Sequence, residues 1–473
     1  MTDDSTPYDF DLLLRNGWVV NAEGTVRADV GVLDGTIVAV GAGLDPTSAA
    51  EVLDVAGKRV LPGVIDPHVH LSVGGADDDA QVQLIVDDLE PESCGAAFGG
   101  VTTMLAMINM EGPYGEALKV IADEAAERSY VNCGATVIVG TAEHVEEIPD
   151  LARFGISGFK HFMNPDYGGF RLVTATERIL IRSLAAITEV GGFALGMVHA
   201  EDSDMNDYLE EQLRARTDAS DLRALADARP GVSESLRMHY VAAIARHLGA
   251  RLHIVHCTSE EGLLSLTPFI NEGVNISVEA VTANLCATHE AWERVGIWGK
   301  FSPPIRGRRH QRALWDGIRS GRIQHIASDH AVWTAAQKEN GGGRFGPIWD
   351  AHPGIANGME HLLPAAITFG VRTGAISWEQ LVALTSTNTA ARFGYTSKGR
   401  IAVGFDADIV VVDGDRADVV DRDYYHGRGA DNSLFWGDVL YGTPDLTVCG
   451  GKVICRDGQL TGARAGAFAP AGG

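Results

Sequence analysis

Between residues 60 and 330 the chain repeats a short apolar run that ends in small or polar residues, and stretches with helical periodicity lie between several of these runs. The eight runs are Val60–His70, Val101–Asn109, Ala135–Thr141, Ile156–Asn164, Gly192–His199, Arg251–Cys257, Val274–Val281 and Ile323–His330. The clearest helical stretches are Gly115–Val131, Thr174–Val190, Ser233–Leu248 and Arg308–Ser320. This alternation predicts parallel strands joined by helical crossovers. Eight such units favour a closed TIM-like (β/α)8 barrel over the alternative, an open doubly wound sheet.

The two ends of the chain have a different pattern. Residues 8–60 contain short apolar runs (Asp11–Arg15, Trp18–Val20, Val30–Leu33, Ile37–Val40) separated by Asn-Gly, Asp-Gly and Gly turn signals, which predicts antiparallel hairpins. Similar runs follow near the other end, at Ile401–Val403, Asp408–Val412, Leu446–Cys449 and Val453–Cys455. Neither end has enough strands for a stable sandwich, so we expect residues 1–61 and 395–458 to share one β-sandwich domain. Residues 62–394 then form the barrel, and residues 459–473 form a loosely ordered tail that could contact a neighbouring subunit.

Composition restricts the partners and the compartment. A formal charge of −25 disfavours nucleic acid and anionic membranes, because a phosphate-binding surface needs clustered Lys and Arg. The start of the chain lacks the pattern of a signal peptide, and no run of about 18 apolar residues follows, so we expect a cytoplasmic protein. The six cysteines form no C-x-x-C pair, which disfavours disulfide frameworks and thiolate zinc sites. Templates for phosphate loops and dinucleotide binding are absent as well.

Six polar side chains stand at the ends of the predicted strands. His68 and His70 point to the same face, because side chains two apart on a strand do so. The other four are Lys160, His199, His256 and Asp329. The carboxyl ends of barrel strands meet at one mouth, where catalytic groups collect. Four imidazoles and two anions, the Asp329 carboxylate and a modified Lys160, suit a pair of divalent metal ions, with zinc the expected metal.

Lys160 fits this set only if it is modified, because an ammonium group cannot bind a cation. Its unmodified alternative is an ion pair at the barrel mouth. Reaction of the amine with CO₂ would give an N6-carboxylated lysine, whose carbamate could bridge two ions about 3.5–4 Å apart.

Several motifs together resemble the cyclic amidohydrolases of the amidohydrolase superfamily, a group that includes hydantoinase, dihydropyrimidinase, allantoinase and dihydroorotase. They are Pro-Gly-Val-Ile-Asp-Pro-His-Val-His (62–70), Gly-Gly-Val-Thr-Thr (99–103), Gly-Phe-Lys (158–160), His-Ala-Glu (199–201), His256, Ser-Pro-Pro-Ile-Arg (302–306), Ala-Ser-Asp-His (327–330) and Lys-Gly-Arg-Ile-Ala-Val-Gly-Phe-Asp-Ala-Asp-Ile-Val (398–410). They occur in the family's order and span about residues 10–455.

The resemblance implies a function for these residues. His68, His70 and Asp329 would bind one metal ion, His199 and His256 the second, and carboxylated Lys160 would bridge both. The implied reaction is the opening of a cyclic amide or ureide ring by a water molecule activated between the ions, and Asp329 would also carry the proton. The resemblance further implies a homo-oligomer, a tetramer or a dimer.

The identity of the ring stays open. Dihydroorotases typically carry an Arg two residues after H-x-H, where this chain has Ser72. The tyrosine that usually follows the bridging lysine by five residues is replaced by Pro165, and Tyr167 is the nearest phenol, either keeping the oxyanion role or serving as a loop aromatic. Ser302 resembles the residue that holds the ring amide, and Asn357 is either a substrate contact or part of a turn.

Other functions compete with this interpretation. Within the superfamily, allantoinase activity or hydrolysis of a cyclic imide or another C–N bond is the main alternative. A non-catalytic scaffold protein related to dihydropyrimidinase is a remote one, because such proteins lose metal ligands and all six ligand types are present here.

Overall fold

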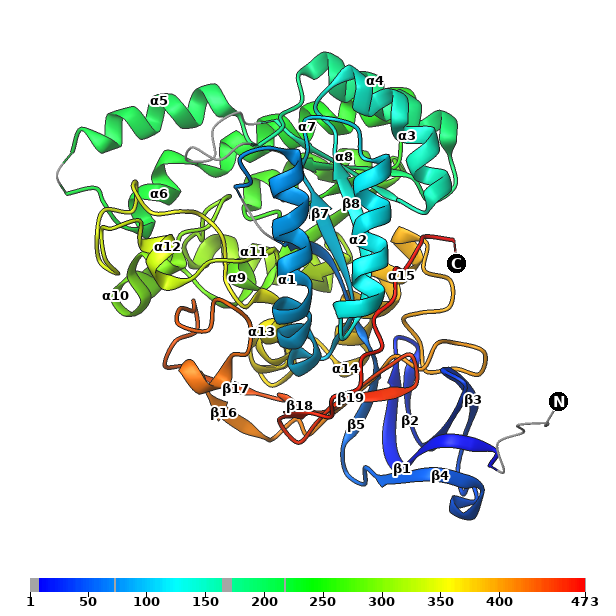
Figure 1. The fold of residues 1–473 in the computed structure, drawn as a ribbon. Coiled ribbons are helices and arrows are strands. Elements are labelled where there is room, and N and C mark those ends of the chain that lie inside the picture. The colour runs from blue at the N-terminus through cyan, green and yellow to red at the C-terminus, as the bar shows by residue number, and fades with distance from the viewer. Residues whose placement is uncertain (1–7, 72–73, 164–171, 217, 473) are drawn as a thin grey trace.

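In the computed structural model, which describes residues 8–71, 74–163, 172–216 and 218–472, the parallel strands form a barrel (Figure 1). Each of the eight predicted runs contributes to it, which confirms the predicted fold class. The strands are β6 (Val64–His70), β7 (Val101–Ile108), β8 (Asn132–Ile138), β9 (Gly158–Phe162), β10 (Leu195–His199), β11 (Leu252–Ile254), β12 (Ile276–Val281), β13 (His325–Ala327) and β14 (His330–Ala331).

The last run closes the ring. β13 pairs with β12, whereas β14, three residues further along the chain, pairs with β6, so that Val69 lies opposite His330. A single segment therefore forms both ends of the nine-stranded parallel sheet. Ser328 and Asp329 occupy the interruption between the two strands.

Helices surround the strands in Figure 1, and many of them begin and end at recognisable caps. In α3, for example, the Thr141 hydroxyl accepts the N–H of His144, and Gly155 ends the helix in the left-handed region at φ 104°. The helices are α1 (Asp78–Gly99), α2 (Gly115–Arg128), α3 (Ala142–Phe154), α4 (Glu177–Val190), α5 (Ser203–Arg214), α6 (Leu222–Ala228), α7 (Gly231–Leu248), α8 (Glu260–Asn271), α9 (Thr282–Cys286), α10 (Trp292–Val295), α11 (Arg308–Arg319), α12 (Ala335–Glu339), α13 (Gly358–Ala366), α14 (Trp378–Val382) and α15 (Asn388–Phe393).

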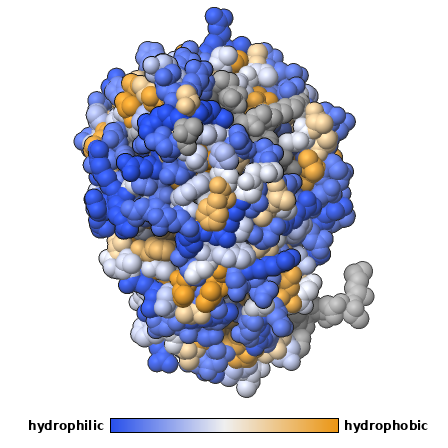
Figure 2. Space-filling model, turned by 90° about the vertical axis from the view of Figure 1, so that its left-hand side faces the viewer, coloured by the Kyte–Doolittle hydropathy of each residue, from blue (hydrophilic) through white to orange (hydrophobic). Residues whose placement is uncertain are grey.

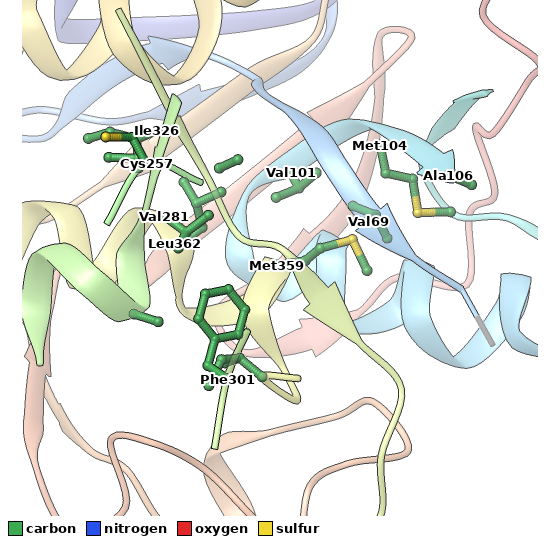
Figure 3. Close-up of a cluster of buried hydrophobic side chains, with 14 of the residues drawn as sticks. Val69, Val101, Met104, Ala106, Cys257, Val281, Phe301, Ile326, Met359 and Leu362 are labelled. Carbon is green, nitrogen blue, oxygen red and sulfur yellow. The ribbon is translucent and has the colours of Figure 1, made fainter. Parts of the chain in front are cut away.

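The largest hydrophobic core joins the barrel strands to the helices around them. Figure 3 draws part of it, with Val69 of β6, Ala106 of β7, Val281 of β12 and Met359 of α13, all of them buried. Burial of one valine or methionine side chain of this kind stabilises the fold by roughly 1.5–3 kcal/mol. The core thus fixes the strand ends that carry the polar residues.

The two ends of the chain form one mixed sheet, which confirms the predicted composite β domain and lies below the barrel in Figure 1. Its strand order is β20-β19-β18-β15-β5-β1-β2-β3, with β4 parallel to β1. These strands are β1 (Phe10–Asn21), β2 (Gly24–Leu33), β3 (Thr36–Gly41), β4 (Ala49–Asp54), β5 (Arg59–Pro62), β15 (Ile409–Val412), β18 (Pro444–Cys449), β19 (Lys452–Arg456) and β20 (Gln459–Leu460). A separate pair consists of β16 (Ala417–Val419) and β17 (Val439–Tyr441).

Two details of the predicted flanks were wrong. The Asn16-Gly17 pair does not reverse the chain but makes a bulge inside β1, with Asn16 at φ 64°. The side chain of Asp29 accepts the N–H of Asn16 at 2.8 Å, which holds this bulge in place of a turn. The segment Ile401–Val403 is not a strand, because the Asn21 side chain takes the N–H of Ile401 that would have joined a ladder.

The 398–410 motif anchors the sheet to the barrel. The ammonium of Lys398 lies 2.8 Å from Asp406 and 2.6 Å from Asp408. The second carboxylate also accepts a hydrogen bond from Asn132, at the start of β8. Charged residues of this motif therefore connect the two parts of the protein.

The last residues differ from the predicted loose tail. They follow the end of the barrel where the strands begin: Cys133 exchanges backbone hydrogen bonds with Ala467 and Ala469, and Ala471 donates to Gly155. Close approach requires small residues here, since a Cβ on Gly466 would lie 2.5 Å from the Ser129 carbonyl oxygen. This segment covers the barrel opposite the predicted site.

Hydrophilic residues predominate on the face drawn in Figure 2, and hydrophobic ones form small, separate groups. Among the described residues, no helix is long and apolar enough to cross a membrane.

Candidate metal centre

The described histidine, lysine and aspartate candidates lie together at the ends of the strands. Nε2 of His68 and Nε2 of His70, both on β6, lie 3.2 and 3.3 Å from the same oxygen, Oδ1 of Asp329. The amine of Lys160, on β9, is 3.3 Å from His68 Nε2. Ligand atoms of His68, His256 and Asp329 all lie within 4.8 Å of one another.

The remaining two histidines face each other. Nδ1 of His199, at the end of β10, lies 2.8 Å from Nε2 of His256, which follows β11. The rings of His68 and His256 have centroids 5.4 Å apart, so this pair adjoins the first group. All six candidates thus converge on one place.

Two of these residues have an uncommon backbone conformation. His256 has φ 35° and Asp329 has φ 47°, in the left-handed region that residues other than glycine seldom adopt. Such strain persists where the surrounding structure enforces it, and it is concentrated at functional sites. Here it turns both side chains toward the common centre immediately after their strands.

Burial sets the protonation states. It lowers the pKa of His68 and His199, and it takes that of His256 well below its ordinary value, which favours neutral rings that can donate a lone pair. Burial acts to raise the pKa of Asp329, but His68 and His70 outweigh it and hold the pKa below its usual value. Neutral imidazoles beside a carboxylate are the donor set that zinc and similar ions prefer.

Lys160 is completely buried, and burial lowers its pKa to about 8. Within the described part of the chain, no carboxylate forms an ion pair with it. Its amine lies 4.9 Å from the centre of the Phe162 ring in addition to its contact with His68. The predicted alternative, an ion pair at the mouth, is therefore not seen among these residues.

Two buried glutamates, for which no role was predicted from the sequence, orient the rings. Glu279, on β12, lies 2.8 Å from His68 Nδ1, and Glu201 lies 2.8 Å from His199 Nε2. Each carboxylate holds the ring nitrogen opposite the one that faces the centre, which fixes the tautomer and the direction of the ligand atom. A lone acid inside the apolar run 274–281 was the available signal for Glu279.

The three predicted substrate residues have different positions. Ser302 lines the cleft above the histidines. Asn357 is not among the described residues that line it; its side-chain amide donates to the carbonyls of Gly429 and Asn432, 2.8 and 3.0 Å away. Tyr167 lies outside the described residues, as do Ser72 and Pro165.

Apolar side chains form most of the cleft wall. Among the described residues, no Lys or Arg lines it. The lining residues are His68, His70, Gly74, Gln81, Met107, Asn109, Ile138, Phe162, Leu172, His199, His256, Phe301, Ser302, Asp329, Ala331, Trp333, Pro353 and Gly354.

Comparison with known proteins agrees with this geometry. Residues 59–454 match the model of the amidohydrolase family. The chain is 32% identical to a D-hydantoinase from Ralstonia pickettii over 96% of each chain, and 31% identical to an allantoinase from Rubrobacter xylanophilus over 97% of each. It superposes on the L-hydantoinase (dihydropyrimidinase) of Arthrobacter aurescens with a TM-score of 0.88 at 28% identity, covering 98% of this chain and 100% of the other. The chain therefore belongs to the amidohydrolase family and, within it, to the cyclic amidohydrolases.

Proposed function

We propose that this protein opens a cyclic amide or ureide ring of the hydantoin or dihydropyrimidine type by hydrolysis. The observation that carries the proposal is the buried convergence of His68, His256 and Asp329 at the floor of an apolar cleft. The D-hydantoinase relative, aligned over 96% of this chain, supports the same reaction class.

The residues fit a pair of divalent metal ions, with zinc the expected metal. His68, His70 and Asp329 would hold one ion, and His199 and His256 the other. This assignment is supported by the shared contact of both β6 histidines with Asp329 and by the facing nitrogens of the other pair. Once bound, two such ions lower the pKa of a water molecule and polarise a carbonyl group.

Lys160 would bridge the ions as an N6-carboxylated side chain. In that reaction the neutral amine adds to CO₂ and releases a proton, leaving a carbamate anion. The lowered pKa of the buried amine supports this, since a larger fraction of it is neutral near pH 7 than of an exposed lysine. The position of its nitrogen beside His68 supports the bridging role.

Asp329 would carry the proton. Its carboxylate lies at the cleft floor, and its lowered pKa keeps it ready to accept a proton when the attacking water molecule adds to the amide carbon. The ring nitrogen then needs a proton as its C–N bond breaks, and the same carboxyl group delivers it. Ser302, at the cleft wall, would hold the ring amide.

The cleft wall favours a ring with an uncharged, largely apolar substituent. Phe162, Phe301 and Trp333 offer aromatic surface, and the described lining offers no cation for a substrate carboxylate. Allantoin, with a polar substituent, is the second candidate. The allantoinase relative and the polar side chains of Asn109 and Gln81 in the cleft favour it.

A substrate screen tests the proposal. Zinc-loaded protein is incubated with hydantoin, 5-phenylhydantoin, dihydrouracil, allantoin and succinimide, and products are detected by the mass gain of one water molecule. We expect ring opening of at least one hydantoin or dihydropyrimidine, and no reaction with protein stripped of metal by a chelator. Zinc-containing protein that opens none of the rings would contradict the proposal, and turnover of allantoin alone would establish the second candidate.

A further inference from the structure

A buried arginine connects Glu201, which holds the His199 ring, to Ser302 of the cleft wall. Arg229 follows α6, and its side chain is only 10% exposed. Its Nη1 lies 2.9 Å from Oε2 of Glu201 and 3.2 Å from the hydroxyl oxygen of Ser302. One guanidinium nitrogen, with two N–H groups, thus reaches both residues.

The Glu201 side of this contact leads to a predicted metal ligand. The same Oε2 accepts the Nε2 hydrogen of His199, and the other carboxylate oxygen accepts a hydrogen bond from Asn206. With Nε2 of His199 used in this way, Nδ1 keeps its lone pair for the centre. A completely buried carboxylate needs a cation beside it, and Arg229 supplies one.

The Ser302 side is held by a second arginine. Arg306, at the end of the Ser-Pro-Pro-Ile-Arg segment, donates through Nη1 to the carbonyl oxygen of Arg229 at 2.5 Å. Its Nε donates to the hydroxyl of Thr258 at 2.8 Å, two residues after His256. The segment that carries Ser302 is therefore attached at both ends to the surroundings of the histidine pair.

We infer that Arg229 is a positioning residue that couples Ser302 to His199. It holds the Ser302 hydroxyl for contact with the substrate and, through Glu201, the His199 imidazole for binding the metal ion. The inference rests on the proposed function, in which Ser302 contacts the ring and His199 binds the second ion. Loss of the guanidinium leaves the buried Glu201 without the cation in contact with it and Ser302 without its donor. Two defects should follow, one in metal affinity and one in KM.

The test compares Arg229→Gln with Glu201→Gln, Ser302→Ala and the two double variants that include Arg229→Gln. Zinc affinity is measured on metal-free protein by competition with a chromophoric chelator, and KM and kcat with a ring compound that the wild type opens. We expect Arg229→Gln to weaken binding of the second zinc ion by about 10–100-fold. KM should rise by about 10-fold, with a smaller change in kcat, as loss of one good hydrogen bond predicts.

Double variants separate coupling from general damage. If Arg229 acts through Glu201, adding Arg229→Gln to Glu201→Gln should weaken zinc binding no further, and Ser302→Ala should mask its effect on KM in the same way. Independent, additive effects, or wild-type zinc affinity in Arg229→Gln, would overturn the inference. The zinc titration needs no turnover, so it remains decisive if the ring-opening proposal fails.

Arg392 offers a control, because it is a half-buried arginine of α15 that donates to the carbonyl of Leu252 at the start of β11. Arg392→Gln should lower thermal stability without changing zinc affinity. An equal loss of zinc affinity in Arg392→Gln would show that destabilisation explains the loss in Arg229→Gln, and would overturn the inference. Where Arg229→Gln does not fold, Arg229→Lys replaces it: a retained charge beside Glu201 should preserve zinc affinity better than KM, and the reverse order would contradict the coupling.

Discussion

The carboxylate of Glu279 lies 2.8 Å from Nδ1 of His68 in the closed interior of the barrel. The same oxygen accepts the backbone N–H of His256 at 3.0 Å. One acid thus turns Nε2 of His68 toward Asp329 and holds the segment that carries the other ligand. Its pKa lies well below the ordinary value, because His68 and His253 outweigh the effect of burial.

Changing Glu279 should therefore weaken the metal centre without removing a ligand. Glu279→Gln replaces a charged acceptor by a neutral one, and we expect zinc affinity to fall by about 10–100-fold with the fold retained. Chelator competition measures the affinity. Glu360→Gln, at another buried acid that is outside the cleft lining, is the control and should bind zinc as the wild type does. Equal affinities in the two variants would contradict this role of Glu279.

Removal of the Lys160 side chain should empty the centre. We expect purified wild type to contain close to two metal ions per chain and Lys160→Ala to lose them, because the bridging anion is gone. Added propionate, a short carboxylate that fits the vacated space, should restore metal and activity. Metal analysis and mass spectrometry of the intact protein check both points. Full occupancy in Lys160→Ala without any added acid would refute the carbamate.

Asp329→Asn should separate metal binding from proton transfer. The amide keeps the shape and an oxygen ligand but cannot accept a proton from the attacking water molecule. We expect a retained fold, at least partial metal and a kcat lower by about 10²–10⁴-fold. Steady-state kinetics on protein of known metal content measures this loss. Near-normal turnover would assign the proton to another group.

His361 should make the protein sensitive to acid. Burial, with a smaller effect of His330, lowers its pKa to about 3, whereas the unfolded chain binds a proton near pH 6.5. Stability is therefore complete above pH 6.5 and falls as the pH drops toward 3, because only the unfolded state takes up the proton. At pH 5 this linkage amounts to about 2 kcal/mol.

His361→Phe removes that linkage while filling a similar space beside Phe435. Tyr425, which lies 3.3 Å from the His361 ring nitrogen, keeps its hydrogen bond with Ser433 at 2.8 Å. Between pH 7 and 5 the free energy of unfolding of the variant should fall by about 2 kcal/mol less than that of the wild type. Urea unfolding at both pH values measures the difference, and parallel losses would show that the imidazole titrates normally in the fold.

The barrel and the six candidate ligands could be predicted from the sequence because both depend on local order. Each strand is an apolar run. Once such a run is assigned as a barrel strand, the polar residue at its end is placed at the mouth of the barrel. His68 and His70 illustrate this, since strand alternation alone directs both rings to one side. The composite sheet could be predicted because neither end of the chain has enough strands for a stable domain of its own.

What could not be predicted depends on contacts between distant residues. Nothing near Arg229 in the sequence indicates that its guanidinium meets Glu201 and Ser302, and Glu279 is recognisable only as an acid in an apolar strand. The Asn16-Gly17 pair carries a hairpin signal, yet Asp29 makes it a bulge. The last residues have a flexible composition, and only the backbone of Cys133 and its neighbours shows that they form an ordered cover.

The interrupted last strand brings together groups that are far apart in the chain. Asp329 lies immediately before β14, whose pairing with β6 closes the ring beside His70, and the N–H of Ser328 donates to Asp66 on β6 at 3.2 Å. His68 and Asp329 are far apart in the chain and meet only when this seam forms. A metal ion bound by His68 and Asp329 would therefore link the first and last strands of the barrel. We expect chelation to loosen these strands before the others, and metal uptake during refolding to report barrel closure.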